Sequence, residues 1–255
     1  MSLSAIILTK NSQDTIVDCI ESVNFCDEII IVDDYSTDNT IDLVTGIKNK
    51  KIKLVRHHLN DDFSAQRNYA LSKSSLDWLL FVDSDEVISE KLHHNIERAV
   101  ESNFYNGYLV KRVDFLWGTK LLHGEAAGVT LLRLAKKGVG KWEGKVHETW
   151  KVRGKVSRLD GELLHYSHKS IYSFVSKINK YTTIRAFELH KLEVNVSLFH
   201  IVLYPFGKFL DNFLIKKGFI DREAGFIHAS LMSFHSFLVR SKLYLLQKGI
   251  SKNLI

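Results

Sequence analysis

The sequence has few of the residues that mark secreted or disordered proteins. It contains two cysteines, Cys19 and Cys26, in 255 residues, too few for a disulfide framework or a four-cysteine zinc site. It contains one proline, and 45% of its residues are hydrophobic, which argues against a disordered linker. We therefore expect one large folded domain, or one domain with a smaller helical appendage.

Signals that direct a chain to or across a membrane are also missing. The first residues, MSLSAIILTKN, lack a basic stretch followed by a long apolar one, so we expect no signal peptide. No run of about eighteen uncharged apolar residues occurs, so no membrane-spanning helix is expected. Together with the unpaired cysteines, this favours a cytoplasmic location.

The two common glycine motifs for phosphate binding do not occur. There is no GxGxxG after the first predicted strand and no GxxxxGK followed by Ser or Thr, which argues against dinucleotide oxidoreductases and P-loop NTPases. The net charge of +6 favours an anionic partner. The basic residues are scattered and form no recognisable nucleic-acid module, so we expect no nucleic-acid partner.

Strand and helix signals alternate over the first hundred residues. Short apolar runs predict strands at 5–8, 29–32, 52–55 and 78–82, and helical spacing predicts helices at 16–23, 36–46 and 64–71 and another after residue 89. Ser36, Ser64 and Ser89 are the expected N-caps of the last three. This order predicts an α/β fold, in which helices cover a parallel sheet.

The second half of the sequence has a different pattern. Residues 108 to about 166 are strand-like, with glycines at the expected turns, and the chain becomes helical after Ser170. Ile171, Phe174, Val175, Ile178 and Tyr181 form the apolar stripe of the first helix there. We expect an α/β domain over residues 1–168 and a helical extension over residues 169–255.

Three acids follow the fourth predicted strand directly, in WLLFVDSDE. Asp83, Asp85 and Glu86 repel one another, so the cluster needs water, a cation or a basic partner. Ligands of parallel sheets bind beyond the carboxyl ends of the strands, where an Asp-x-Asp step can hold Mg²⁺ or Mn²⁺ together with substrate phosphates. The alternative is a solvated acidic turn, but the position after a buried strand favours the metal site.

Two more acids, Asp33 and Asp34, follow the second predicted strand in IVDDYSTDNT, and Asn11 follows the first. We expect them at the same edge of the sheet. A carboxylate there can accept a hydrogen bond from the imide of a uracil or from a ribose hydroxyl. Ser36 and Asp38 are placed to cap the next helix, so the two roles fall on different residues.

A glycine-flanked segment, GVGKWEGKVHETW, contains further candidates. Glu148, next to His147, could take a proton from an acceptor hydroxyl in an inverting transfer, and Trp142 could stack on a sugar. A β-hairpin with an exposed glutamate and a core tryptophan explains the segment equally well. In LHYSH, His165 or His168 could complete a Mn²⁺ site or contact a diphosphate, and the sequence does not choose between them.

Five segments resemble, in order and spacing, the family 2 glycosyltransferases with the GT-A fold: AIILTKN, IVDDYSTDNT, FSAQRNYAL, WLLFVDSDE and KWEGKVHE. The resemblance spans about Ser4 to His168. Within the family, it is closer to the bacterial branch that includes the lipopolysaccharide core β-glucosyltransferases. GFIDREAGF, farther on, resembles the C-terminal part of that branch. The resemblance implies a Rossmann-like, mixed, mostly parallel sheet with helices on both faces, followed by a C-terminal helical segment.

The same resemblance implies an inverting transfer of a hexose from a nucleotide sugar, in the first place a UDP-sugar, with Mg²⁺ or Mn²⁺. The acceptor would be lipopolysaccharide core or another cell-envelope glycan. The family often has Ser at position 34, so the resemblance does not decide which of Asp33 and Asp34 contacts the base. The expected roles are nucleotide or donor binding for Asn11, Asp33, Asp34, Arg67 and Asp83, metal binding for Asp85 and His165, general base for Glu148, and sugar or acceptor contact for Trp142 and His147.

The C-terminal segment is rich in aromatic and basic residues, FHIVLYPFGKFLDNFLIKKGF. This composition suits an amphipathic element on an anionic membrane surface. A peripheral place on the inner face of the cytoplasmic membrane would suit a lipid-linked glycan acceptor. Packing on the α/β domain, or a homodimer contact, explains the segment equally well.

Two other classes of protein compete with this interpretation. A sugar nucleotidyltransferase would need a glycine-rich, arginine-containing loop after the first strand, where this chain has LTKNSQD. A non-catalytic protein that binds a nucleotide sugar or carbohydrate would not need Asp83, Asp85 and Glu148 together. Their presence favours an enzyme.

Overall fold

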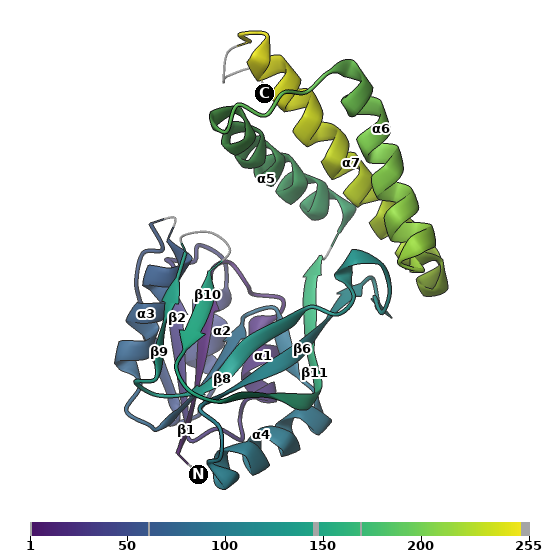
Figure 1. Ribbon diagram of the computed structural model, residues 1–255. Helices are drawn as coiled ribbons and strands as arrows, with labels where there is room; N and C mark the ends of the chain where they lie inside the picture. Colours follow the sequence, from purple (N-terminus) through teal and green to yellow (C-terminus); the bar gives the residue numbers. More distant parts are fainter. Residues whose placement is uncertain (1, 61, 145–147, 169, 251–255) are drawn as a thin grey trace. The chain divides into compact units, whose positions relative to one another are not determined.

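The computed structural model describes residues 2–60, 62–144, 148–168 and 170–250, without the side chains of residues 167 and 168. The chain forms two compact units (Figure 1). Unit 1 comprises Met1–Val113 and Val129–Tyr166, and unit 2 comprises Asp114–Gly128 and Ser167–Ile255. Residues 114–128 therefore belong with the C-terminal helices.

Strands and helices alternate through the first part of unit 1, as the apolar runs predict (Figure 1). The helices are α1 (Ile16–Ser22), α2 (Thr40–Gly46), α3 (Phe63–Lys73) and α4 (Glu90–Ser102). The strands are β1 (Leu3–Thr9), β2 (Glu28–Asp33), β3 (Ile52–Arg56), β4 (Trp78–Asp83), β5 (Glu86–Ile88), β6 (Gly107–Leu116), β8 (Thr130–Lys136), β9 (Gly140–Glu143), β10 (Thr149–Val152) and β11 (Val156–His168).

The main sheet has the strand order β3-β2-β1-β4-β8-β6-β11-β5. β3, β2, β1 and β4 run parallel, and β8 then pairs with β4 antiparallel. The fold is thus the α/β GT-A type expected, a mixed sheet with a Rossmann-like parallel half. β6, β8 and β11 come from the glycine-rich segment that the sequence predicts to be strand-like, whereas β5, which pairs antiparallel with β11, directly follows β4 in the sequence. β9 and β10 form a separate hairpin.

Helices cover both faces of the parallel strands because successive side chains of a strand point to opposite faces. On one face, Leu3, Ala5 and Ile7 of β1 pack with the apolar sides of α1 and α4. On the other face, Ile6 packs with Ala70 of α3 and with the two tryptophans of the β9–β10 hairpin. Strands buried on both faces are continuously apolar for this reason.

Two expected helix starts are wrong, and neighbouring acids explain both. α2 begins at Thr40 rather than after Ser36, because the N–H and hydroxyl groups of Ser36 both donate to Asp33. α3 begins at Phe63, because Asp62, not Ser64, accepts the capping hydrogen bond from the Ala65 N–H. The cap of α4 at Ser89 is confirmed, since its hydroxyl accepts from the Leu92 N–H.

Both cysteines are buried as free thiols. Burial raises the pKa of Cys19, and the nearby carboxylates Glu86 and Asp85 raise it further. Burial raises the pKa of Cys26 as well. The two side chains therefore act as small core residues.

Unit 2 is mainly helical. Its long helices are α5 (Ile171–Lys191), α6 (Leu198–Leu210) and α7 (Arg222–Gln247). Between α6 and α7 lie a π-helical turn, η2 (Asp211–Ile215), and a short 3-10 turn, η3 (Gly218–Asp221). The chain segment between β6 and β8 adds β7 (Thr119–Lys120) and a 3-10 turn, η1 (Gly124–Ala126).

Polar contacts join the segments of unit 2. The Lys242 ammonium on α7 is buried and donates to Asn179, Thr182 and Thr183 of α5. Asp221 accepts from the N–H of His123 at 2.8 Å and lies 2.7 Å from its ring Nδ1. These bonds tie α5 to α7, and the segment between β6 and β8 to η3.

The apolar stripe expected on α5 is partly wrong. Phe174 and Ile178 are buried as expected, but Ile171 and Tyr181 are about half exposed. The buried side continues instead through Thr182 and Ala186. The buried side of α5 thus includes Thr182, which accepts a hydrogen bond from Lys242 of α7.

One helical segment in the described part of the chain, Leu198–Ile215, is long and apolar enough to be a candidate for spanning a membrane. Only 6% of it is buried. It contains Lys208 and Asp211, which is why the search for uncharged runs in the sequence did not find it.

Two glycines of unit 2 give a matched test of helix packing. A Cβ on Gly225 would overlap the carbonyl oxygen of Gly218, whereas a Cβ on Gly207 would meet nothing within 4 Å. We expect Gly225→Ala to lower the free energy of unfolding by about 2 kcal/mol. We expect Gly207→Ala to raise it by about 0.5–1 kcal/mol, because alanine favours helix.

Urea unfolding followed by circular dichroism measures both changes. Equal destabilisation by the two substitutions would contradict the close approach of α7 to η3.

Candidate active site

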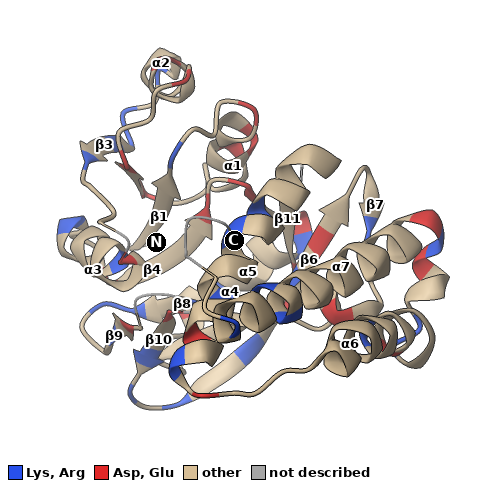
Figure 2. Ribbon diagram, turned by 90° about the horizontal axis from the view of Figure 1, so that it is seen from above, with Lys and Arg blue, Asp and Glu red and all other residues tan. Residues whose placement is uncertain are grey.

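The carboxyl ends of β1, β2 and β4 lie side by side. In the sheet, Thr9 is paired with Asp33, and Leu8 is paired with Asp83. The residues expected at this edge are thus brought together by strand register. Figure 2, seen from above, shows acidic residues at the end of β4.

A buried chain of charges begins at the end of β4. Asp83 accepts a hydrogen bond from Arg67 of α3 at 2.8 Å and another from Arg133 of β8 at 2.7 Å. Arg133 also donates to Glu86 at 2.8 Å, and Arg67 donates to Glu148 at 3.0 Å. Both guanidinium groups are about 5% exposed. Two cations therefore bind three carboxylates, and these five residues come from four parts of the chain.

The titration of these groups follows from the contacts. Burial would raise the pKa of Asp83, but Arg133 and Arg67 outweigh it and hold that pKa well below its usual range. Burial raises the pKa of Glu86, which Arg133 offsets only in part. Burial would lower the pKa of Arg133, but Asp83 and Glu86 raise it above its usual value. Asp83 is thus ionised, and its charge is already paired within the protein.

This network corrects the expected reason for the acidic cluster. A cation was expected to make the three acids tolerable, but basic side chains neutralise Asp83 and Glu86. Glu86 is an expected member of the acidic cluster without an assigned role, whereas Arg133 is not among the residues expected at the site. An arginine within the apolar run LLRLA of β8 is the signal that could have found it, because a buried arginine requires an acidic partner.

Asp85, the second acid of the Asp-x-Asp step, lies beside His165. The Asp85 Oδ2 is 3.5 Å from the His165 Nε2, and the His165 side chain is 14% exposed. β11 pairs with β5 here, since His165 is opposite Glu86. The structure therefore brings His165 to the acidic turn, whereas the side chain of His168 lies outside the described residues.

These two residues fit a divalent cation better than Asp83 does. A carboxylate and an imidazole are ligand types that Mn²⁺ accepts, and Mg²⁺ is commonly held by one or two carboxylates plus phosphates. Asp83 already shares both of its oxygens with arginines. Among the described residues, a three-residue cluster of metal-ligand type is found elsewhere, on α4, at His93, His94 and Glu97.

The expected nucleotide-binding acids have different surroundings. Asp33 is fully buried and closes a turn by accepting from Ser36. Asp34 pairs with Lys10 at 2.6 Å and accepts from the Leu59 N–H at 3.0 Å. The Asp33 carboxylate is thus occupied within the turn. The Asp34 carboxylate is paired with the exposed ammonium group of Lys10.

Two aromatic rings that the sequence did not suggest come from the loops after β2 and β3. Tyr35 and His58 stack with their ring centres 3.9 Å apart, and Tyr35 is 44% exposed. Tyr35 has a left-handed backbone conformation, with φ of 51°. Nearby, the Asn11 amide oxygen accepts from the Thr37 N–H at 2.8 Å. Asn11 thus joins the loop after β1 to the loop after β2.

Trp142 lies in the core beneath the charged chain. It is 6% exposed and stacks on Trp150, with ring centres 5.4 Å apart. The Arg67 guanidinium carbon lies 4.6 Å from the centre of the Trp142 ring. The structure therefore gives Trp142 a supporting position under Arg67. His147 lies outside the described residues.

A cavity of about 510 Å³ opens over these groups. A cavity of this size accommodates a small ligand. The charged residues of its lining are Arg67, Asp83, Arg112, Arg133 and Glu148.

The mixed sheet and the strand-end site define the GT-A class of glycosyltransferase fold. Residues 4–151 match the family described as glycosyl transferase family 2, and the chain belongs to that family. An uncharacterized glycosyltransferase of Rickettsia typhi is 30% identical over 94% of this chain and 86% of its own length. The lipopolysaccharide core biosynthesis glycosyltransferase LpsC of Rhizobium meliloti is 28% identical over 96% of this chain and 92% of its own.

Solved structures support the same fold. The structure of S. aureus TarS 1–349 in complex with UDP has a TM-score of 0.51 at 18% identity, covering 98% of this chain and 92% of that one. The same fragment in complex with UDP-GlcNAc also has a TM-score of 0.51, at 15% identity and the same coverage. At these identities the likeness concerns the fold.

The role of Arg133 can be tested through stability. Arg133→Met would leave Asp83 and Glu86 buried with one cation fewer, so we expect the free energy of unfolding to fall by about 3–5 kcal/mol. The control is Lys141→Met, which removes the partner of Glu143 in an exposed pair of unit 1 and should change it by less than about 1 kcal/mol. Urea unfolding compares the two. A similar small loss from both would mean that Arg133 is not needed to hold the acids.

Proposed function

We propose that this family 2 glycosyltransferase is an inverting, metal-dependent hexosyltransferase. The donor would be a UDP-sugar and the acceptor a cell-envelope glycan, with lipopolysaccharide core as the first candidate. One observation carries the proposal: Arg67 links Glu148 to Asp83 at a cavity beyond the carboxyl ends of the strands. The match to a lipopolysaccharide core biosynthesis glycosyltransferase supports the acceptor class.

The nucleotide would bind at the loops after β1 and β2. Asp34 is the better candidate for the base, because Asp33 is fully buried and occupied by Ser36. Asn11 would position the loop that receives the ribose, since its amide oxygen holds the Thr37 N–H. The exposed ring of Tyr35, stacked on His58, adds a flat surface beside Asp34.

The donor diphosphate would lie near Arg67, Asp83 and Asp85. Arg67 Nη1 has no hydrogen-bond partner among the described residues, which suits a guanidinium group that also serves an anionic ligand. Asp85 and His165 would hold Mg²⁺ or Mn²⁺, which offsets negative charge on the departing diphosphate. Asp83 would hold the two arginines in place and contact the donor from its exposed part.

Glu148 would act as the general base. In an inverting transfer its carboxylate takes the proton of an acceptor hydroxyl while that oxygen bonds to the anomeric carbon. The bond from this carbon to the diphosphate breaks, and the electron pair leaves with the nucleoside diphosphate. The ion pair with Arg67 keeps Glu148 close to the donor. His147, adjacent in sequence, is proposed to contact the acceptor, and Trp142 to support Arg67.

A lipid-linked acceptor would place the reaction on the inner face of the cytoplasmic membrane. Residues 1–168 would form the domain that carries out the transfer. Residues 169–255 would bind the membrane surface or form a homodimer contact. The competing function is binding of a nucleotide sugar without transfer. A sugar nucleotidyltransferase has less support, because the loop LTKNSQD has no glycine or arginine.

The base can be tested on a panel of nucleotide sugars with Mn²⁺. We expect one UDP-sugar to release UDP slowly, and faster with lipopolysaccharide core oligosaccharide. Glu148→Gln should reduce the accelerated rate by roughly 10²–10⁴-fold and leave UDP binding intact. Glu143→Gln is the matched control, because Glu143 is an exposed acid of the same hairpin.

Two results would count against the proposal. An unchanged rate for Glu148→Gln would exclude this residue as the base. Coupled uptake of UDP and Mn²⁺ in calorimetry, with no release from any donor even when the oligosaccharide is present, would favour a binding protein.

The metal site can be tested without turnover. Asp85→Asn should weaken UDP binding in the presence of Mn²⁺ by roughly tenfold or more and leave binding in EDTA unchanged. The control is Asp77→Asn, an exposed acid just before the amino end of β4. Calorimetric titration with UDP measures both. An equal loss with and without Mn²⁺ would mean that Asp85 contacts the nucleotide rather than a cation.

A further inference from the structure

The outer side of α6 is apolar and uncovered. No residue of the helix is buried. Phe199, Val202 and Phe206 are each between 61% and 69% exposed, and their spacing of three, four and seven residues puts them on one face. A soluble helix normally turns such a stripe toward a core, so this face lacks the cover that its composition requires.

α7 extends the same apolar surface. The two helices lie side by side (Figure 1). Phe226 of α7 meets Phe209 and Phe213 edge-on, with ring centres 5.8 and 5.6 Å apart. Phe234 and Phe237, farther along α7, are each 40% exposed. We call six exposed side chains of the two helices the α6–α7 apolar face: Phe199, Val202, Phe206, Phe226, Phe234 and Phe237.

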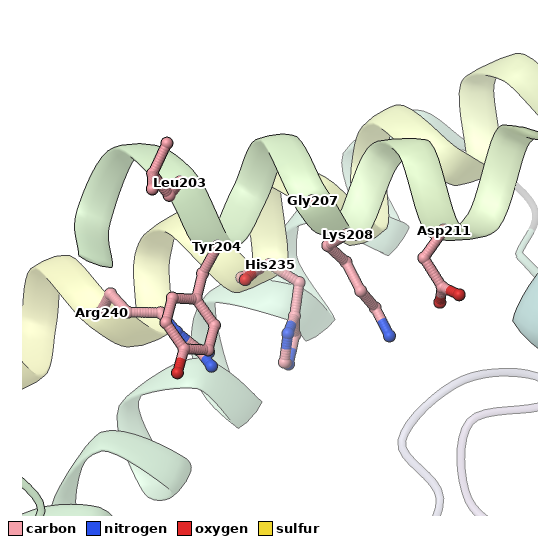
Figure 3. A pocket seen from close by; sticks show the side chains of 8 residues that line it. Leu203, Tyr204, Gly207, Lys208, Asp211, His235 and Arg240 are labelled. Carbon is pink, nitrogen blue, oxygen red and sulfur yellow. The ribbon is translucent and has the colours of Figure 1, made fainter. Parts of the chain in front are cut away.

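Polar side chains of the two helices gather elsewhere. Figure 3 shows Tyr204 and Lys208 of α6 and Asp211 of η2 with His235 and Arg240 of α7 on one side of the helix pair. They line a cavity of about 580 Å³. The helix pair is therefore amphipathic as a whole, and its apolar side chains are not scattered at random.

Charge is divided unevenly between the units. Unit 2 has 14 Lys and Arg against seven Asp and Glu in its sequence, a net charge of +7. Unit 1 has 21 against 22, a net charge of −1. The whole positive charge of the protein thus resides in the unit that carries the apolar face. Lys216 and Lys217 directly follow the apolar segment Leu198–Ile215.

Electrostatics favours a bilayer over a second copy as the occupant of this face. Two copies joined through it would bring two units of charge +7 together, and like charges repel. An anionic bilayer surface attracts the same charge. Apolar area and basic charge are the two components of interfacial helix binding.

Polar anchors argue against a spanning position for α6. Lys208 pairs with Glu125 of η1, and Asn212 accepts from the Glu125 N–H at 2.9 Å. Asp211 pairs with Lys216 at 2.7 Å. A helix that crossed the bilayer would carry these charged groups into the hydrocarbon region, which is costly. Lying in the interface keeps these contacts.

We propose that the α6–α7 apolar face binds the surface of an anionic phospholipid bilayer, with α6 lying in the plane of the interface. This goes beyond the proposed transfer reaction and does not depend on it. The phenylalanines would insert among the acyl chains, and the lysines at the end of α6 would contact lipid phosphates.

Vesicle cosedimentation of the full chain tests the proposal. We expect the protein to pellet with vesicles containing about one third phosphatidylglycerol, less with pure phosphatidylcholine, and less as salt rises. Val202→Asp with Phe206→Asp should weaken binding by roughly tenfold or more. Phe104→Asp is the matched control, because Phe104 is 69% exposed but lies in unit 1; it should bind like the wild type.

A second variant keeps the test independent of folding. Phe206→Trp preserves the apolar surface, and brominated lipid should quench the fluorescence of the new tryptophan. In Phe104→Trp, brominated lipid should quench no more fluorescence than it does in the wild type, which contains only the native tryptophans. UDP binding should be unchanged in all variants.

Three outcomes would overturn the proposal. The first is wild-type protein that stays in solution with anionic vesicles. The second is equal vesicle binding by wild type and the double Asp variant. The third is a wild-type dimer that the double variant dissociates without any effect on vesicle binding, which would assign the face to a second copy.

Discussion

The position of Asp83 between two arginines is the constraint on which the structure of unit 1 depends. Each oxygen of its carboxylate accepts a hydrogen bond from a different guanidinium group, one on α3 and one on β8. These elements are 66 residues apart in sequence at the points of contact, Arg67 and Arg133. A single buried carboxylate thus fixes the end of the parallel half of the sheet against its antiparallel continuation. Removal of Arg133 would leave Glu86 buried without a cationic partner among the described residues, which is costly.

The same constraint fixes the β9–β10 hairpin. Arg67 holds Glu148 on one side and lies over the Trp142 ring on the other. Asn68, the next residue of α3, exchanges two hydrogen bonds of 2.9 Å with the backbone of Trp142. The proposed base therefore belongs to a hairpin that α3 holds by two consecutive residues. The arginine that binds Glu148 also binds Asp83, so the positions of these two carboxylates are coupled.

Much of the fold could be predicted because its signals are local. The four apolar runs gave four parallel strands, and their order placed Asp33 and Asp83 at one edge, as the pairing of β1 with β2 and β4 requires. Helix starts were less predictable, because an acid two or three residues away can take the capping role, as Asp62 does instead of Ser64. Arg133 could not be predicted because its partners are 47 and 50 residues away in sequence. Local sequence patterns do not indicate contacts between residues so far apart. The roles of Asp85, His165 and Glu148 remain predictions, although the structure places the first two side by side.

The burial of both cysteines has a practical consequence. Their thiols are enclosed, and the pKa of each is raised, so neither offers a reactive thiolate near neutral pH. Native cysteines therefore need not be removed before a surface position is converted to cysteine. One such position in each unit would accept a maleimide fluorophore or a nitroxide selectively. Energy transfer or electron spin resonance could then measure the separation of the two units in solution and follow it as substrates are added.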